Sequence, residues 1–296
     1  MKYQVAHTLR LTFPAPVWEH HCEVRLAPFA NDHQRVHALE LSVDPPAEPV
    51  SFLDCFGNTA HTFCVLTPHA ELTIRLRARV ETTLANPFDY AVLPPSRERD
   101  WVDESLRAQP RLRDFLLWRS PATPVPSALA AVDLDWPVHD PNRPLLDSVQ
   151  TALDWMTDAL PYERGFAPTA LPLADAFAAG AAGCQALSHL LISLVRSWGF
   201  PARYVMGYVD PAYAEDEDDQ PLPQLPHAWT EVLIPGAGWR GFDPTTQLVA
   251  NDTYVAVAVG RDANDALPMK ASFKGGEPDG GVKTEDSLDV QPTHDQ

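Results

Sequence analysis

The chain has few cysteines, few basic residues and no long apolar segment. Its 296 residues include four cysteines, none of them in a Cys-x-x-Cys pair. So large a chain with so few cysteines is not a disulfide scaffold, and a reducing cytoplasm is the expected compartment. No apolar run is long enough to span a bilayer, and the N-terminus lacks the basic and apolar parts of a signal peptide. We therefore expect a globular cytoplasmic protein that does not bind membranes.

Positive charge is also scarce. Twenty-two Lys and Arg stand against 40 Asp and Glu, which gives a formal net charge of -18. Such a surface repels phosphates, so nucleic acid is excluded as an expected partner. Acidic residues gather in the run 215–219 and after Lys274. The first lacks the ligand spacing of a calcium loop and is interpreted as a solvated loop, and the second as an acidic tail.

No cofactor and no metal site are expected. The run His20-His21-Cys22 carries metal-binding residue types, but neighbouring strand residues point to opposite faces and cannot converge on one ion.

The first ninety residues show the alternation of half-buried strands. In 72–79 every second residue is apolar and the intervening residues are Thr73 and three arginines, and similar patterns occur in 3–13, 20–26 and 36–43. Turn residues separate these segments. The spacing predicts an antiparallel β-sandwich over 1–90, in which Cys22, Cys55 and Cys64 are expected to pack.

The remainder divides into a connector and an α+β domain. Residues 91–140 are rich in proline and charge, which predicts a connector with short helices near 103–118. Residues 141–296 are assigned to a second domain, where helical periodicity covers 143–160 and 187–198. Strand patterns follow in the second domain, at residues 203–209, 227–234, 239–243 and 253–259. The fold class is therefore α+β.

Cys184 lies at the predicted start of the second helix, after the small residues 180–183. Unpaired N–H groups and the helix dipole at such an N-terminus stabilise a thiolate over a thiol. The same N–H groups can hold the oxyanion of an acyl-transfer intermediate. A buried, inert cysteine is the structural alternative. His189, five residues further on, points to another face and is expected to be a core histidine.

His227 and Asp243 belong to two segments that predict a hairpin. With the turn centred near Pro235, Trp229 faces Gly241 and His227 faces Asp243. Opposed side chains on neighbouring strands can bond across the ladder, so the carboxylate would orient the imidazole as a general base requires. A surface His–Asp pair is the alternative without the cysteine. Together with Cys184, the pair gives the order Cys, His, Asp along the chain, which is the order of the triad in papain-like acyl transfer.

These segments resemble the bacterial transglutaminase-like proteins. The resemblance rests on Gly183-Cys184-Gln185 and on the runs at 201–208, 227–232, 238–245 and 257–262. Phe56-Gly57-Asn58 and the run 68–72 resemble the β-sandwich domain that precedes the catalytic domain in these proteins. Taken together, these similar segments extend over nearly the whole chain. The sequence departs from the usual pattern at Ala186, where an acidic residue is common, and at Ala263, where a tyrosine is common.

The resemblance implies a papain-like catalytic domain with Cys184 as nucleophile, His227 as base and Asp243 as orienting acid. It implies a peptide or protein substrate and, as genomic neighbours, ATP-grasp peptide ligases. The expected activity is that of a cysteine peptidase or amidase acting through a thioester. Protein-glutamine transamidation and a non-catalytic peptide-binding module on the same fold are the alternatives.

Overall fold

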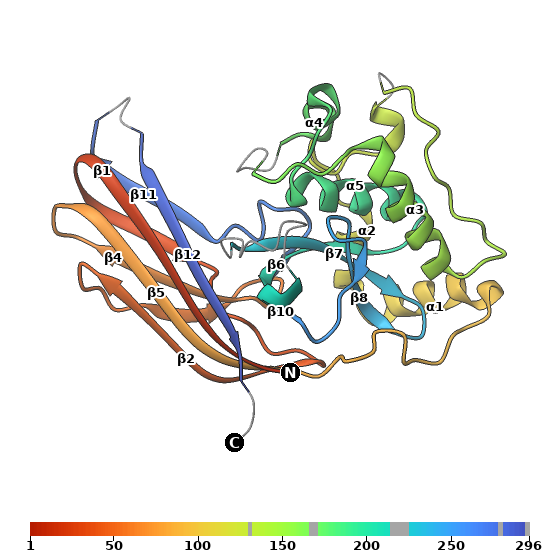
Figure 1. Ribbon diagram of the computed structural model, residues 1–296, viewed down its shortest axis with the longest axis horizontal. Coiled ribbons are helices and arrows are strands. Elements are labelled where there is room, and N and C mark those ends of the chain that lie inside the picture. The colour runs from red at the N-terminus through yellow and green to blue at the C-terminus, as the bar shows by residue number, and fades with distance from the viewer. Residues whose placement is uncertain (130–131, 166–170, 214–224, 278–280, 294–296) are drawn as a thin grey trace.

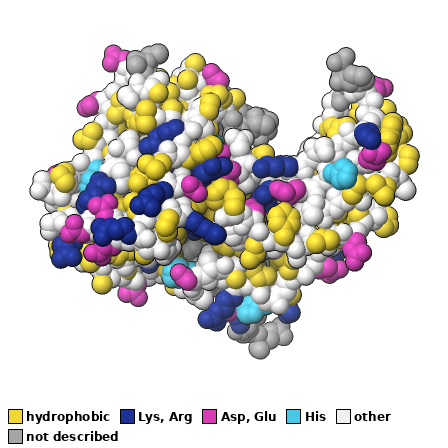
Figure 2. All heavy atoms as spheres, turned by 180° about the vertical axis from the view of Figure 1, so that it is seen from behind, with side chains coloured by type: hydrophobic (Ala, Val, Ile, Leu, Met, Phe, Trp, Pro, Cys, Tyr) yellow, Lys and Arg dark blue, Asp and Glu magenta, His cyan; other side chains and the backbone are white. Residues whose placement is uncertain are grey.

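The computed structural model describes residues 1–129, 132–165, 171–213, 225–277 and 281–293, and the acidic run 215–219 lies outside them. The chain forms a strand-rich body and a body in which helices cover a second sheet (Figure 1). The predicted α+β class is confirmed. Seen from behind, a notch opens between the two bodies (Figure 2).

One long strand, β1 (Lys2–Val24), organises the strand-rich body. The sheet order is β2-β5-β1-β4-β3, all antiparallel. The partner strands are β2 (Gln34–Asp44), β3 (Val50–Leu53), β4 (Thr59–Val65) and β5 (His69–Thr82). The pairing of β1 with β5 shifts between Thr12 and Val17, where Pro14 and Pro16 have no N–H to donate. The two halves of β1 enclose one apolar core, which includes Leu11, Phe13, Val24, Phe63 and Leu72.

Two expectations for this body are wrong. Residues after Lys274 do not form an acidic tail, because β11 (Met269–Gly275) and β12 (Lys283–Pro292) return to pair with β1. Leu288 and Val290 are buried while Asp289 between them is exposed, a period-2 pattern that the high charge obscured. Cys55 is exposed in a turn, whereas Cys22 is buried and Cys64 half-buried.

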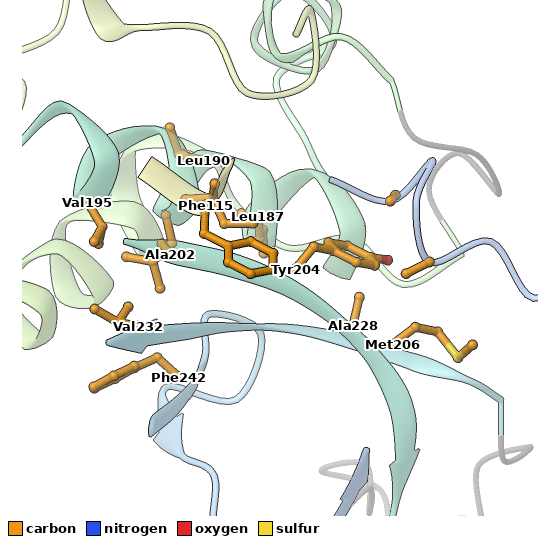
Figure 3. Packing of buried hydrophobic residues seen from close by; sticks show 14 of the residues in the cluster. Phe115, Leu187, Leu190, Val195, Ala202, Tyr204, Met206, Ala228, Val232 and Phe242 are labelled. Atoms are coloured by element: carbon orange, nitrogen blue, oxygen red, sulfur yellow. The ribbon is translucent and has the colours of Figure 1, made fainter. Parts of the chain in front are cut away.

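The second sheet has the antiparallel order β10-β6-β7-β8-β9. Its strands are β6 (Ala202–Val209), β7 (His227–Ile234), β8 (Gly238–Asp243), β9 (Leu248–Val249) and β10 (Tyr254–Gly260). Helix α5 (Cys184–Ser197) packs against β6 and β7. Leu187 and Leu190 of α5 lie above Ala202, Ala228 and Val232 (Figure 3), and the Thr230 hydroxyl donates to the Ser188 carbonyl at 2.9 Å. The contact fixes the helix relative to the strand that begins with His227.

The other helices surround α5. They are α1 (Pro95–Ala108), α2 (Asp114–Leu117), α3 (Leu145–Ala159) and α4 (Leu173–Ala179), with 3-10 turns at Pro110–Arg113, Pro126–Leu129 and Pro211–Tyr213. Helix α3 falls within the predicted segment 143–160. In the connector, α1 begins earlier than expected because Pro95 occupies a first helical position, where its missing N–H costs nothing. No helix among the described residues is long and apolar enough to cross a bilayer.

A buried arginine joins the connector to the second body. The Arg196 guanidinium on α5 donates to the carbonyls of Phe115, Trp118, Ala202 and Arg261 at 2.6–3.1 Å. Burial lowers the pKa of Arg196 to about 9, although neighbouring carboxylates oppose that fall. Its donors are thus satisfied by backbone carbonyls from three separate segments, which holds those segments together.

Two side-chain amides cover the free edge of β10. Gln34 accepts from the N–H of Ala256 and donates to its C=O, both at 2.8 Å. Asn58 does the same with Val259 at 2.7 and 2.8 Å. A β-bulge between Ala256 and Ala258 explains how residues three apart present the same edge. Each amide offers one donor and one acceptor, as a neighbouring strand would. Side chains of the strand-rich body therefore satisfy backbone groups at the edge of the second sheet.

We expect Asn58→Asp to destabilise the fold by about 2–4 kcal/mol, because a fully buried carboxylate would replace the N–H that faces the Val259 carbonyl and Asp54. Chemical denaturation with urea would measure this loss. Asn86→Asp is the matched control, since Asn86 is exposed and its side-chain oxygen accepts a hydrogen bond from the N–H of Phe88, which a carboxylate also accepts. Equal stability of the two variants would contradict the role given to Asn58.

Candidate active site

Cys184 is the first residue of α5. The residue before it, Gly183, is extended, and no side chain caps the helix. The thiol is free and half-buried. The helix begins here because Gly180, with φ at +76°, ends α4 and lets the chain reverse before the run 181–183. The first N–H groups of α5 have no acceptor within the helix, so they surround the sulfur with positive partial charge.

His227 and Asp243 form a close pair where β7 begins and β8 ends. The Nε2 atom of His227 lies 2.8 Å from Oδ2 of Asp243. The His227 side chain is 19% exposed and that of Asp243 is 0% exposed. The Tyr254 hydroxyl donates to the same Oδ2 at 3.0 Å, and the Thr245 N–H donates to Oδ1 at 2.9 Å. Three donors thus satisfy a carboxylate that has no contact with water.

Charge stabilises the protonated imidazole. Burial alone would lower the pKa of His227. The charge of Asp243 and its hydrogen bond, followed by the hydrogen bond and charge of Cys184, raise that pKa well above the ordinary value. Burial would raise the pKa of Asp243, but His227, Thr245 and Tyr254 together lower it. The imidazole is therefore bonded to a carboxylate and lies within electrostatic range of the Cys184 thiol. The structure brings all three predicted residues together.

The predicted register of the hairpin is wrong by two residues. Glu231, not Trp229, lies opposite Gly241, and Leu233 lies opposite Trp239. The turn comprises Pro235, Gly236 and Ala237, with Gly236 at φ +83°, so it is centred one residue later than expected. His227 and Asp243 are therefore not directly opposed. A shift of two keeps every side chain on its original face, and the pair meets diagonally.

Trp229 fills the space beneath the pair. A β-carbon at Gly207 would lie 2.5 Å from the indole, and one at Gly241 would lie 3.1 Å from its Nε1. Both glycines therefore leave room for the ring. The indole stacks on His227 at 6.5 Å between centroids and meets Tyr254 edge-on at 5.2 Å. Trp229 thus packs between the imidazole and the tyrosine that holds Asp243.

Sequence reasoning missed Tyr254 and Tyr162. Tyr254 is the second residue of the predicted strand 253–259, and nothing in a strand pattern indicates that its hydroxyl reaches a carboxylate on another strand. Tyr162 follows α3 and is bridged to Ala182, two residues before the nucleophile candidate. Burial, followed by the charge of Cys184, raises the pKa of the Tyr162 phenol, which places this ring in electrostatic range of the thiol.

His189 is a core histidine, as predicted. It is fully buried, and its Nε2 accepts from the N–H of Ala263 at 3.0 Å. Burial lowers its pKa to about 4, so the ring is neutral and able to accept. The small side chain of Ala263 packs within the same core.

The arrangement of Cys184, His227 and Asp243 suits nucleophilic attack by the thiol. A thiol at a helix start, beside an imidazole whose far nitrogen is held by a buried carboxylate, can form a thiolate–imidazolium pair. Such a pair supports attack on an acyl carbon, and the first N–H groups of the helix can receive the negative charge that develops on oxygen.

Comparison with known proteins agrees with this arrangement. Residues 3–81 match the bacterial transglutaminase-like N-terminal region, and residues 137–244 match the transglutaminase-like superfamily. The chain is 28% identical to the uncharacterized protein ML0607 of Mycobacterium leprae, over 93% of this chain and 94% of that protein. It is 26% identical to the uncharacterized protein Rv2569c of Mycobacterium tuberculosis, over 91% and 86% of the two chains.

A solved structure has the same fold. It is that of a candidate cysteine protease from Cytophaga hutchinsonii, with a TM-score of 0.72, 20% sequence identity and coverage of 100% of this chain and 92% of that one. The two matched regions and the similarity along nearly the whole chain lead to one conclusion: the chain belongs to the transglutaminase-like superfamily, with a bacterial transglutaminase-like N-terminal region before the matched superfamily domain.

Proposed function

We propose that Cys184, His227 and Asp243 form the catalytic triad of a cysteine peptidase or amidase. The observation that carries the proposal is the position of the His227 imidazole, which is bonded through Nε2 to Asp243 at 2.8 Å while it contacts the Cys184 thiol. A surface His–Asp pair would not have a fully buried carboxylate with three donors. An inert core cysteine would not stand at a helix start beside a charged imidazole.

The proposed reaction proceeds in two stages. His227 takes the thiol proton on Nδ1, and the sulfur of Cys184 attacks the carbonyl carbon of an amide while the backbone N–H of Cys184 binds the resulting oxyanion. The intermediate collapses as the C–N bond breaks, and His227 gives its proton to the leaving amine. Asp243 keeps the imidazole in one tautomer and stabilises its charge. A thioester on Cys184 remains.

Water completes the reaction in the hydrolytic form that we propose. His227 removes a proton from water, the hydroxide attacks the thioester, and the C–S bond breaks to release a carboxylic acid. An amine in place of water would give transamidation. The similarity in fold to a candidate cysteine protease supports the hydrolytic form. The substrate is proposed to be a peptide or protein, and the compartment the cytoplasm, where a nucleophilic thiol stays reduced.

A trapped acyl-enzyme tests the chemistry. Incubation with a library of blocked synthetic peptides is expected to add one acyl fragment to Cys184, because the thioester forms before water attacks it. Intact-protein and peptide mass spectrometry would locate the adduct, and Cys184→Ala is the control. Release of the free acid supports a peptidase. Exclusive transfer to an added amine would identify a transamidase, and peptide binding without any adduct would leave only the binding-module alternative.

Alkylation tests the state of the thiol. Iodoacetamide is expected to modify Cys184 at mildly acidic pH at least tenfold faster than Cys55, which is the exposed reference thiol in the same chain. The reason is that the His227 imidazolium stabilises the thiolate. His227→Ala is expected to remove the difference, with Cys55 unchanged. Wild-type protein in which both cysteines react at the same rate would show that no ion pair forms.

The pH profile tests Asp243. Because the Asp243 charge raises the pKa of His227, the imidazolium persists to higher pH than an isolated histidine would allow. Asp243→Asn removes that charge, lowers the pKa of His227 and moves the alkaline limb of kcat/KM to lower pH, with a loss of about a hundredfold in kcat. Asp265→Asn, which alters a half-exposed pair with Arg261, is the control. An unshifted alkaline limb would exclude this role for Asp243.

A further inference from the structure

Tyr162 lies in a short extended segment directly beside the candidate nucleophile. The C=O of Pro161 accepts from the N–H of Ala182 at 3.0 Å, and the C=O of Ala182 accepts from the N–H of Glu163 at 2.9 Å. These two bonds form a parallel bridge between Tyr162 and Ala182. Both bonds on this segment use the residues on either side of Tyr162, so its own backbone groups take no part in them.

Strand geometry directs those groups outward. In an extended chain the N–H and C=O of one residue point to the same side, and those of the next residue point to the opposite side. The N–H and C=O of Tyr162 therefore point away from Ala182. Within the described part of the chain, no hydrogen bond involves either of them. Residues 161–165 are all exposed, so this edge is open to an incoming chain.

The open edge is close to the reacting groups. Ala182 precedes Cys184 by two residues, and adjacent strands lie about 5 Å apart, so a chain added on the far side of Tyr162 would lie about 10 Å from Ala182. The Tyr162 side chain, 44% exposed, lies within electrostatic range of both Cys184 and Asp243. An extended chain paired with Tyr162 therefore has the sulfur within reach of a peptide bond only a few residues away.

We infer that the backbone of Tyr162 is a substrate-docking edge, at which an extended peptide adds as a short strand and is held by main-chain hydrogen bonds. This inference rests on the proposed function and specifies its substrate class. Main-chain pairing needs an acyl donor with peptide bonds beyond the one that is broken, and it is indifferent to most side chains. A small isolated amide gains nothing from it. The substrate is thus a peptide or an unstructured protein segment.

A proline scan at this edge tests the inference. Tyr162→Pro removes the outward N–H and leaves both bonds to Ala182, which use Pro161 and Glu163. Tyr162→Ala is the matched control, since it removes the phenol and keeps the N–H. With the best peptide from the acyl-enzyme library, Tyr162→Pro is expected to lower kcat/KM about tenfold relative to Tyr162→Ala, which is the effect of one lost hydrogen bond.

Further measurements distinguish the loss of peptide docking from damage to the thiol. Turnover of p-nitrophenyl acetate, which has no peptide chain, and the iodoacetamide rate at Cys184 are expected to be equal in both variants, which would show that the thiol is intact. N-methylation of the peptide substrate, one bond at a time, is expected to find one position that weakens turnover about tenfold with wild-type protein. This measurement needs no variant.

The outcomes separate the inference from the proposed function. Equal kcat/KM for Tyr162→Pro and Tyr162→Ala, or a peptide that tolerates N-methylation at every position, would overturn the docking edge while the acyl-enzyme still formed. If wild-type protein formed no acyl-enzyme with any library member, the proposed function itself would fail.

Discussion

The site depends on one buried carboxylate. Asp243 has no exposed surface, and a charged group in that position is costly unless donors replace the water it has lost. Three donors do so: the N–H of Thr245, the hydroxyl of Tyr254 and the imidazole of His227. The imidazole contributes most when it is protonated. The carboxylate therefore orients His227 and favours its charged form.

The position of Asp243 also depends on the strand-rich body, through Tyr254. Tyr254 belongs to β10, the edge strand of the second sheet, and an edge strand in isolation would be free to shift. Gln34 and Asn58 occupy that edge with paired donor and acceptor contacts. The bond between Tyr3 and Asp210 and the contact between His7 and Tyr208 join the same bodies near β6. The strand-rich body thus holds β10, and β10 holds the hydroxyl that supports Asp243.

The sequence allowed the elements to be predicted better than their register. Periodicity identified the helix that starts near Cys184 and the two strands with His227 and Asp243, because burial imposes period 3.6 or period 2 on apolar residues. It placed the hairpin turn one residue early, since Pro235, Gly236 and Gly238 all favour turns and the choice between centres depends on the observed positive φ of Gly236. The predicted pairing of His227 with Asp243 is still correct, because a register error of two residues leaves both side chains on the same face of the sheet.

Long-range pairings could not be predicted in the same way. β12 has only two buried apolar residues, and its partner β1 lies at the other end of the chain. Composition alone therefore indicated a tail. Tyr254 and Tyr162 were missed for a related reason, because their roles depend on which strands become neighbours. A hydroxyl or an unpaired backbone group leaves no periodic signal in the sequence.

The short run 180–183 serves two purposes that require the same small residues. Gly180 reverses the chain after α4, and the backbone of Ala182 then pairs beside Tyr162 before α5 begins at Cys184. Gly180 is required for its positive φ, and a larger side chain at the fully buried Ala182 would disturb the pairing of the two extended segments. The same few residues thus position the nucleophile at a helix start and support the strand whose outer edge faces an incoming chain.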